Sequence, residues 1–215
     1  MHIQPNFRAP APANCNEPGV SHLLHTAQPA AVSLYPENAV IYAQGDAAGP
    51  LYYVEFGTVR ICRMSADGRR QITAFHTAGE VFGFEVGAEH QSYAESVDGA
   101  GIRTLRVNRS GDFDSSLLKL AVRSLARTQD HLMVLGRRSA NERLAALLLD
   151  LAERQGSTGL VHLPMQRNDI ADYLGLTFET VSRILRCLKD SRIIRLSSVS
   201  EVEILDFEAL QAMCD

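Results

Sequence analysis

One stretch of the chain limits its possible folds more than any other, and it runs from Arg167 to Lys189 as RNDIADYLGLTFETVSRILRCLK. Its apolar residues recur at helical spacing on both sides of one glycine: Ile170, Leu174, Leu176, Val181 and Ile184. Gly175 can adopt the positive φ that ends a first helix, and the Thr177 hydroxyl can cap a second one. With the small Ala171 placed where the two helices cross, the pattern predicts a helix-turn-helix.

The second of these helices has two different faces. Val181, Ile184, Leu185 and Leu188 recur at helical spacing and are expected to be buried, which leaves Glu179, Ser182, Arg183 and Arg186 on the opposite face. Arginine can donate two parallel hydrogen bonds to guanine, and glutamate can accept from cytosine N4. An ordinary helical hairpin also exposes a polar face, but here turn, cap, core and readout positions agree. The DNA-binding residues are predicted to be Arg167, Thr177, Glu179, Thr180, Ser182, Arg183 and Arg186.

The segment from Gly175 to Arg183 (GLTFETVSR) resembles the recognition segment of the CRP/FNR family of bacterial transcription regulators. Its Glu179, Ser182 and Arg183 match the Glu-x-x-Ser-Arg pattern of the FNR and FixK branches. The resemblance implies a homodimer that binds a double-stranded DNA palindrome with TTGA-like half-sites. Arg183 would read the guanine and Glu179 the bases paired opposite. It also implies an activator that contacts RNA polymerase.

Charge is distributed unevenly along the chain. The net charge is −4 with a pI near 6.0, so no global basic field indicates a nucleic-acid partner. From Thr177 to Arg195, five cations and two anions give 5 − 2 = +3. No apolar run approaches the roughly 20 residues that a membrane span needs, and no signal-peptide pattern opens the chain. We therefore expect a cytoplasmic protein with no membrane partner.

Residues 1–30 are rich in Ala, Pro, Asn and His and are predicted to form a flexible arm, with a short helix near residues 21–26. Oxygen sensors of the FNR type carry clustered cysteines here, but this arm has only Cys15. One thiolate cannot hold a cluster that needs four ligands. The lack of clustered cysteines argues against a built-in iron–sulfur sensor. It favours the FixK branch, in which oxygen is sensed by a separate system.

Residues 31–112 contain short β-rich runs separated by glycines, which predicts a sandwich or barrel. The runs are Val40–Tyr42, Leu51–Val54, Val59–Cys62, Gln71–Phe75 and Ile102–Val107. Asp67-Gly68 favours a hairpin, and Gly45, Gly57 and Gly79 fall where strand pairs would turn. The region resembles the jelly-roll effector domain of the same family.

The usual ligand contacts of that domain are missing. Residues 79–94 contain no arginine to hold a cyclic phosphate, and Glu85 and Glu89 would repel an anion. His76 or His90 could ligate haem iron, but nothing in the sequence pairs them. Cupin-type ligand sets and nucleophile motifs are also missing. We therefore expect no cofactor, no metal and no enzymatic activity.

Residues 113–138 are predicted to form a dimerisation helix. Its coiled-coil seam is Leu118, Ala121, Leu125, Thr128, Leu132 and Leu135. Leu117 and Val122 would serve a second face, against the chain's own barrel. A symmetric dimer would place two recognition helices roughly 34 Å apart, which matches a palindrome.

Residues 139–215 are predicted to be a winged helix-turn-helix domain. Arg137–Asn141 would be the hinge, Glu142–Leu151 the first helix, and the alternating runs Ile193–Leu196 and Val202–Leu205 the wing. Asp206 would cap a last short helix that extends through Met213.

Cys187 lies four residues after Arg183, close to the expected DNA backbone. It is either a small, partly buried apolar residue or a redox brake whose pKa is lowered by neighbouring cations.

The expected fold class is α+β, with a jelly roll, a dimer helix and a winged helix-turn-helix. The expected function is a FixK-like regulator of low-oxygen and nitrogen-fixation genes. The alternatives are a regulator gated by a small molecule or haem, and a ligand-binding module that does not contact DNA.

Overall fold

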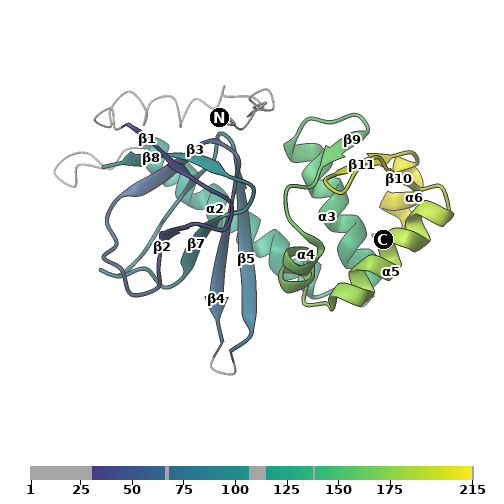
Figure 1. The fold of residues 1–215 in the computed structure, drawn as a ribbon, viewed down its shortest axis with the longest axis horizontal. Helices are drawn as coiled ribbons and strands as arrows, with labels where there is room; N and C mark the ends of the chain where they lie inside the picture. Colours follow the sequence, from purple (N-terminus) through teal and green to yellow (C-terminus); the bar gives the residue numbers. More distant parts are fainter. Residues whose placement is uncertain (1–30, 66–67, 107–114, 138, 215) are drawn as a thin grey trace, which may run out of the picture.

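Two domains joined by one long helix make up the molecule (Figure 1). The computed structural model describes residues 31–65, 68–106, 115–137 and 139–214. The N-terminal domain holds strands β1 to β8, and the C-terminal domain holds α3 to α6 and β9 to β11. The predictions for residues 1–30, including a helix near residues 21–26, and for Asp67 lie outside the described residues.

The N-terminal domain is a β-roll of two four-stranded sheets, one in the order β1-β8-β3-β6 and the other β2-β7-β4-β5. Its strands are β1 (Val32–Tyr35), β2 (Val40–Tyr42), β3 (Leu51–Phe56), β4 (Thr58–Met64), β5 (Arg70–Thr77), β6 (Val81–Phe82), β7 (Tyr93–Ser96) and β8 (Ala100–Leu105). All the pairings within the two sheets are antiparallel. The predicted jelly roll is confirmed, although β1, β6 and β7 had no predicted counterpart.

Glycine makes one of the turns between strands sterically possible. Gly57 joins β3 to β4 with φ 81°, and a Cβ atom built on it would lie 2.1 Å from the carbonyl oxygen of Gly99. No side chain fits so close to another backbone segment. The turns predicted at Gly45 and Gly79 also have positive φ, both 90°.

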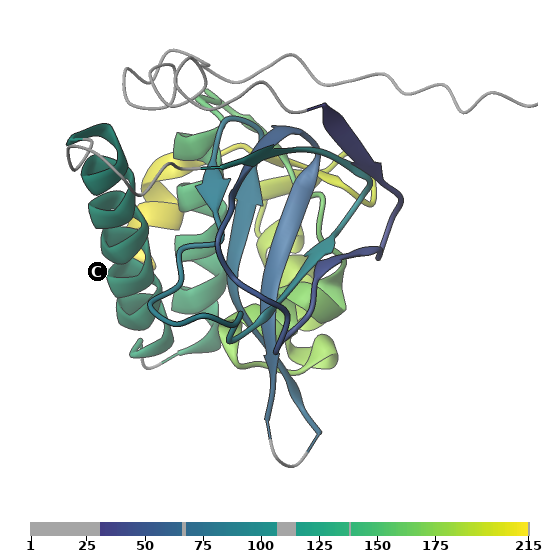
Figure 2. The same ribbon diagram turned by 90° about the vertical axis from the view of Figure 1, so that its left-hand side faces the viewer.

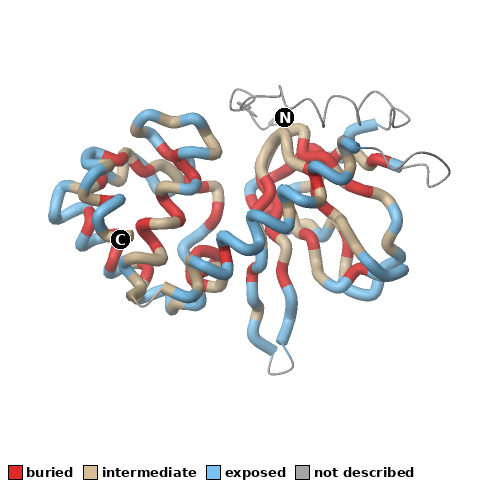
Figure 3. The backbone as a smooth tube through the Cα atoms, turned by 180° about the vertical axis from the view of Figure 1, so that it is seen from behind, coloured by how far each residue is buried: buried red, intermediate tan, exposed pale blue. Residues whose placement is uncertain are grey.

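Helix α2 (Ser115–Leu135) lies along the β-roll and leads to the C-terminal domain (Figure 2). Leu117 and Leu120 on its inner face pack against the β-roll core. The prediction that Val122 lies on the same inner face is wrong, because its side chain is 56% exposed. It lies beside Leu118 and Leu125 of the predicted seam, which are also exposed. In Figure 3, many residues of α2 have the colour of exposed residues.

The C-terminal domain begins with α3 (Ala140–Arg154), whose N-terminus is capped by the Ser139 hydroxyl accepting from the Glu142 amide at 3.1 Å. The helix therefore starts inside the segment predicted as a hinge, and it extends past Leu151. The prediction missed this start because Ser139 followed by Glu142 is a capping pair rather than a break in the chain. The other helices are α4 (Arg167–Leu174), α5 (Phe178–Asp190) and α6 (Phe207–Ala212).

Beside the helices lies a three-stranded sheet in the order β10-β11-β9. Strands β10 (Ile194–Leu196) and β11 (Glu201–Ile204) form the predicted wing, and β9 (Leu160–His162) adds a third strand that the prediction lacked. Asp206 caps α6 as predicted, with its Oδ1 accepting from the Ala209 amide at 2.8 Å. Within the described parts of the chain, no helix is long and apolar enough to span a membrane.

Candidate nucleic-acid interface

The helix-turn-helix forms through two local devices at its turn. Gly175 has φ 63° and ends α4, and the amides of Gly175 and Leu176 both donate to the carbonyl of Ala171. Two residues later, Thr177 opens α5 with its hydroxyl accepting from the Thr180 amide at 3.3 Å. Both ends of the turn are therefore where the sequence predicted them.

Helix α5 separates its apolar and polar residues cleanly. The buried residues are Val181, Ile184, Leu185 and Leu188, each at most 4% exposed. They share the domain core with α3 and the wing strands. This burial fixes the helix on its scaffold, so the opposite face is presented to solvent in a defined orientation.

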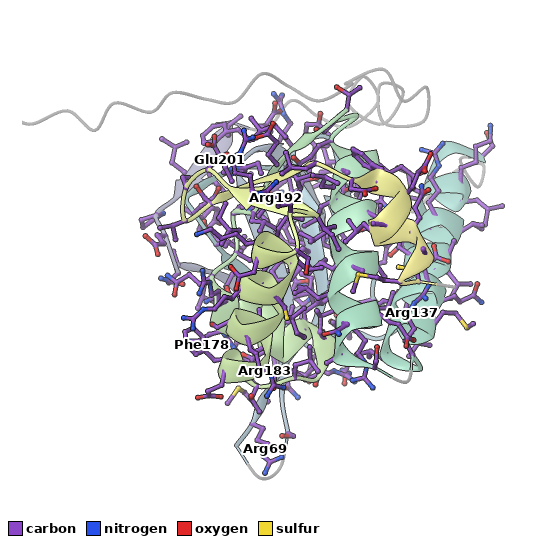
Figure 4. All side chains as sticks on the ribbon, turned by 90° about the vertical axis from the view of Figure 1, so that its right-hand side faces the viewer. Arg69, Arg137, Phe178, Arg183, Arg192 and Glu201 are labelled. Atoms are coloured by element: carbon purple, nitrogen blue, oxygen red, sulfur yellow. The ribbon has the colours of Figure 1, made fainter. Side chains whose placement is uncertain are left out.

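The opposite face carries the residues predicted to bind DNA. Glu179, Arg183 and Arg186 are exposed, and among the described residues no ion pair or hydrogen bond engages the two guanidinium groups. Figure 4 shows Phe178 and Arg183 toward the start of α5 and Arg192 beyond its other end. Two free cations near the first turns of a helix are available to bind an anionic partner.

The remaining predicted residues hold the start of α5 together. Arg167 at the first position of α4 donates from Nη1 to the Ser182 hydroxyl at 3.3 Å. The Thr177 hydroxyl donates to the Thr180 hydroxyl at 3.1 Å. Four of the seven predicted residues therefore contact one another in pairs, and all seven lie on α4, the turn or α5.

Glu179 occupies the first turn of α5. Its own backbone amide and then the Thr177 hydroxyl hydrogen-bond the ionised form, so the pKa of this fully exposed carboxyl lies below its ordinary value. The side chain therefore stays an acceptor at neutral pH, as readout of cytosine N4 requires.

Helix α4 is fixed to the β-roll by an ion-pair network that the sequence did not reveal. Arg60 of β4 binds Asp169 of α4 through Nη1 at 2.9 Å, and Arg70 of β5 also pairs with Asp169. Arg70 Nε donates to Asp172 at 2.9 Å. Glu95 of β7 binds the Nε of Arg60 at 2.7 Å. The network couples the orientation of the helix-turn-helix to the N-terminal domain.

A second network joins three elements around Glu80. Its carboxylate lies 3.1 Å from Arg154 of α3, 3.0 Å from Arg127 of α2 and 3.5 Å from His76 of β5. Burial opposes ionisation of Glu80, but the hydrogen bond from His76 and the charges of Arg154 and Arg127 outweigh it and lower the pKa to about 2. The carboxylate is therefore ionised at neutral pH.

Comparisons with known proteins give a consistent assignment. Residues 142–213 match the Crp-like helix-turn-helix domain, and residues 32–97 match the cyclic nucleotide-binding domain. The chain is 45% identical over 187 residues to the nitrogen fixation regulation protein FixK of Rhizobium meliloti (strain 1021), covering 87% of this chain and 89% of that protein. This chain belongs to the CRP/FNR family of transcription regulators.

Further relatives place it in the FixK branch of the CRP/FNR family. The FixK of Azorhizobium caulinodans is 40% identical, with 84% of this chain and 78% of that protein covered. The solved structure of FixK2 from Bradyrhizobium japonicum superposes with a TM-score of 0.79 at 36% identity, covering 86% of this chain and 98% of the other. The predicted family and fold class are confirmed, and the protein is a DNA-binding transcription regulator.

The β-roll of this CRP/FNR member does not fit the cyclic nucleotide that its domain family implies. Residues 79–94 supply no arginine, and Glu85 accepts from the Gln91 amide at 3.0 Å while facing His90. Tyr42 stacks on the buried His90 ring with centroids 3.6 Å apart, and Tyr52 stacks on Phe82 at 5.3 Å. These rings belong to a packed interior that offers no charge-assisted donor for a phosphate.

The histidines considered as haem ligands have other roles in the β-roll. His90 is fully buried beside Tyr42, and His76 lies against Glu80. Within the described residues, no group of three His, Cys, Asp or Glu side chains converges as a metal site would require.

Cys187 is exposed, so the interpretation as a partly buried apolar residue is wrong. Its thiol lies on α5 between Arg186 and the buried Leu188. A residue that the sequence did not single out is Phe178, the first residue of α5, which is 45% exposed. The sequence signal that could have identified Phe178 is an aromatic residue directly after the N-cap Thr177.

Proposed function

We propose that this protein binds, as a homodimer, DNA palindromes of the type TTGA-N6-TCAA. Arg183 donates to guanine O6 and N7, and Glu179 accepts from the bases opposite. Ser182 and Arg186 complete the contacts to bases and phosphates. Arg167, Thr177 and Thr180 contact the sugar-phosphate backbone of the DNA near the start of α5. The observation that carries the proposal is the pair of exposed, unengaged guanidinium groups on the α5 face beside an ionised Glu179.

The exposed face of α2 supports the dimer. Leu118, Leu125 and Leu132 are 49%, 58% and 61% exposed in the single chain, and they repeat with the spacing of a coiled-coil seam. A second copy related by a two-fold axis would cover them, and the same axis would match a palindrome. The proposed segments are an N-terminal arm (1–30), a β-roll (31–112), a dimerisation helix (113–138) and a DNA-binding domain (139–215).

The biological role is proposed from the relatives. Two of them are named nitrogen fixation regulation proteins, so this protein is proposed to control nitrogen-fixation and low-oxygen genes. Activation through contact with RNA polymerase follows from the family resemblance. Because promoter DNA and RNA polymerase are found in the bacterial cytoplasm, the protein is proposed to act there.

The stoichiometry and symmetry of binding test the proposal. Reduced protein without any effector is titrated into a fluorescent TTGA-N6-TCAA duplex, and the mass of the complex is measured by sedimentation. We expect two chains per duplex. Changing the guanine pair of one half-site should weaken binding, and changing both should reduce it to the non-specific level. One chain per duplex, or equal affinity for all three duplexes, would contradict the proposal.

Cys187 is proposed as a redox brake on the same surface. Its exposure lets an oxidant reach the thiol, and oxidation to an acid would place negative charge beside the DNA phosphates. Peroxide treatment should abolish binding by the native protein and leave Cys187→Ser bound to DNA. Loss of binding in both proteins would refute the brake.

A further inference from the structure

A cavity of about 130 Å³ lies where both domains meet the connecting helix. Its walls come from β5 (Phe75), α2 (His131), α3 (Arg154) and α4 (Tyr173). None of its lining residues belongs to the stretch 79–94, so it is separate from the ligand region of the β-roll. Arg127 lines it with a side chain that is 46% exposed, which provides a route from solvent.

Three buried nitrogen atoms of the lining residues lack a hydrogen-bond partner among the described residues: Nδ1 of His76, Nδ1 of His131 and Nε of Arg154. His131 is 8% exposed. Burial lowers its pKa to about 4, so its ring is neutral at physiological pH. Of the three, Nδ1 of His76 faces the Glu80 carboxylate at 3.5 Å. Buried polar groups in native proteins normally have partners, so the other two atoms, on His131 and Arg154, indicate an occupant.

Charge on the cavity wall favours an uncharged occupant. Arg127 and Arg154 are balanced within the lining by Asp130 and Asp150. The terminal nitrogens of Arg154 are already committed, Nη2 to Glu80 and the Phe75 carbonyl and Nη1 to Asp150. The buried Nε–H of this arginine has no acceptor among the described residues, and it requires one.

The volume and the aromatic lining of the cavity favour a molecule of one ring. The rings of His131 and Tyr173 are stacked with centroids 3.9 Å apart, and Phe75 lies 5.1 Å from Tyr173 at 59°. An apolar cavity of about 150 Å³ holds benzene, so a volume of this order admits one ring.

We propose that this cavity binds an uncharged, single-ring molecule that carries a hydrogen-bond acceptor, of the aromatic amide class. The acceptor takes the Nε–H of Arg154, the ring lies against Tyr173 and Phe75, and a polar group meets Nδ1 of His131. Such a molecule contacts elements of both domains and stabilises the arrangement in which they meet.

Benzamide serves as the probe, and the readout does not involve DNA. The full chain is titrated while nitrogen-15 spectra follow the Nε–H of Arg154 and the ring of His131. Both signals should shift with saturation at one benzamide per chain. Benzoate adds a negative charge to the ligand, and toluene lacks its hydrogen-bond acceptor. Each should bind at least 10-fold more weakly than benzamide. No saturable shift up to the solubility limit would mean that water alone fills the cavity, which would overturn the proposal, as would toluene binding equally well.

A filled cavity provides the matched variant. Ser124 lines the cavity and is partly buried, so Ser124→Leu should occupy the space and weaken benzamide at least 10-fold. Ser33→Leu adds the same side chain at an exposed site on β1 and should leave binding unchanged. Equal benzamide affinity in the two folded variants would also overturn the proposal.

Discussion

Arg60 and Asp169 are separated by 109 residues in sequence, yet Nη1 of the arginine lies 2.9 Å from Oδ2 of the aspartate. The side chains are 8% and 5% exposed. The pair connects the central part of β4 to the first turn of α4, so it links the β-roll to the helix-turn-helix directly.

Asp169→Asn should lower the free energy of unfolding by about 3 kcal/mol, because it removes the buried charge that pairs with both Arg60 and Arg70. Urea unfolding gives the comparison. Asp190→Asn at the exposed end of α5 is the matched control and should change stability by less than about 0.5 kcal/mol. Equal stability of the two variants would show that the network does not stabilise the fold.

Acidification should destabilise the protein through His131. Burial lowers its pKa from 6.5 to about 4, so the unfolded chain binds the proton more tightly between those values. Stability is therefore retained above about pH 6.5 and falls as the pH drops toward 4. The melting temperature of His131→Phe should fall less over this window than that of the native protein. His162→Phe, at an exposed position, is the control and should keep the native pH profile.

Gly175→Ala should destabilise the C-terminal domain by about 1 kcal/mol, because an alanine is strained at φ 63°. A Cβ there would meet nothing closer than 3.7 Å, so the cost comes from the backbone alone. Gly87→Ala is the matched control, since that glycine has no positive φ and its nearest neighbour is 4.0 Å away. Urea unfolding should place only the first variant below the native protein.

Leu125→Glu should dissociate the proposed dimer, because it places like charges opposite each other in the seam. Ala126→Glu adds the same charge one residue later, on an exposed position outside the seam, and should leave the dimer intact. Sedimentation velocity distinguishes monomer from dimer. If the Leu125 variant sediments as the native protein does, α2 is not the dimer interface.

The helix-turn-helix was predictable because its determinants are local. Gly175, Thr177 and the apolar residues of α5 lie within one continuous segment, and each acts on its neighbours. Strands β1 and β7 were missed for the opposite reason. Their sequences, VSLY and YAES, are only four residues long, too short to show a sustained period, and pairing with β8, β2 and β4 fixes them.

The ion pairs that hold α4 against the β-roll could not be predicted from local sequence patterns either. Asp169 and Asp172 look like ordinary polar residues of α4 until β4 and β5 bring Arg60 and Arg70 against them. Val122 was misplaced because the sequence shows two apolar faces on α2 without showing which one the β-roll covers. Leu120 is the residue that the roll buries instead.

The most direct test of the account measures how Arg183 and the guanine of the half-site depend on each other. Native protein and Arg183→Ala are titrated against the TTGA-N6-TCAA duplex and against one with its guanine pairs changed. The variant should lose about 10- to 100-fold on the first duplex and bind both equally. Lys189→Ala, an exposed cation at the other end of α5, should weaken both duplexes to the same extent. If Arg183→Ala still prefers the guanine-containing site, Arg183 does not read that base and the central claim is wrong.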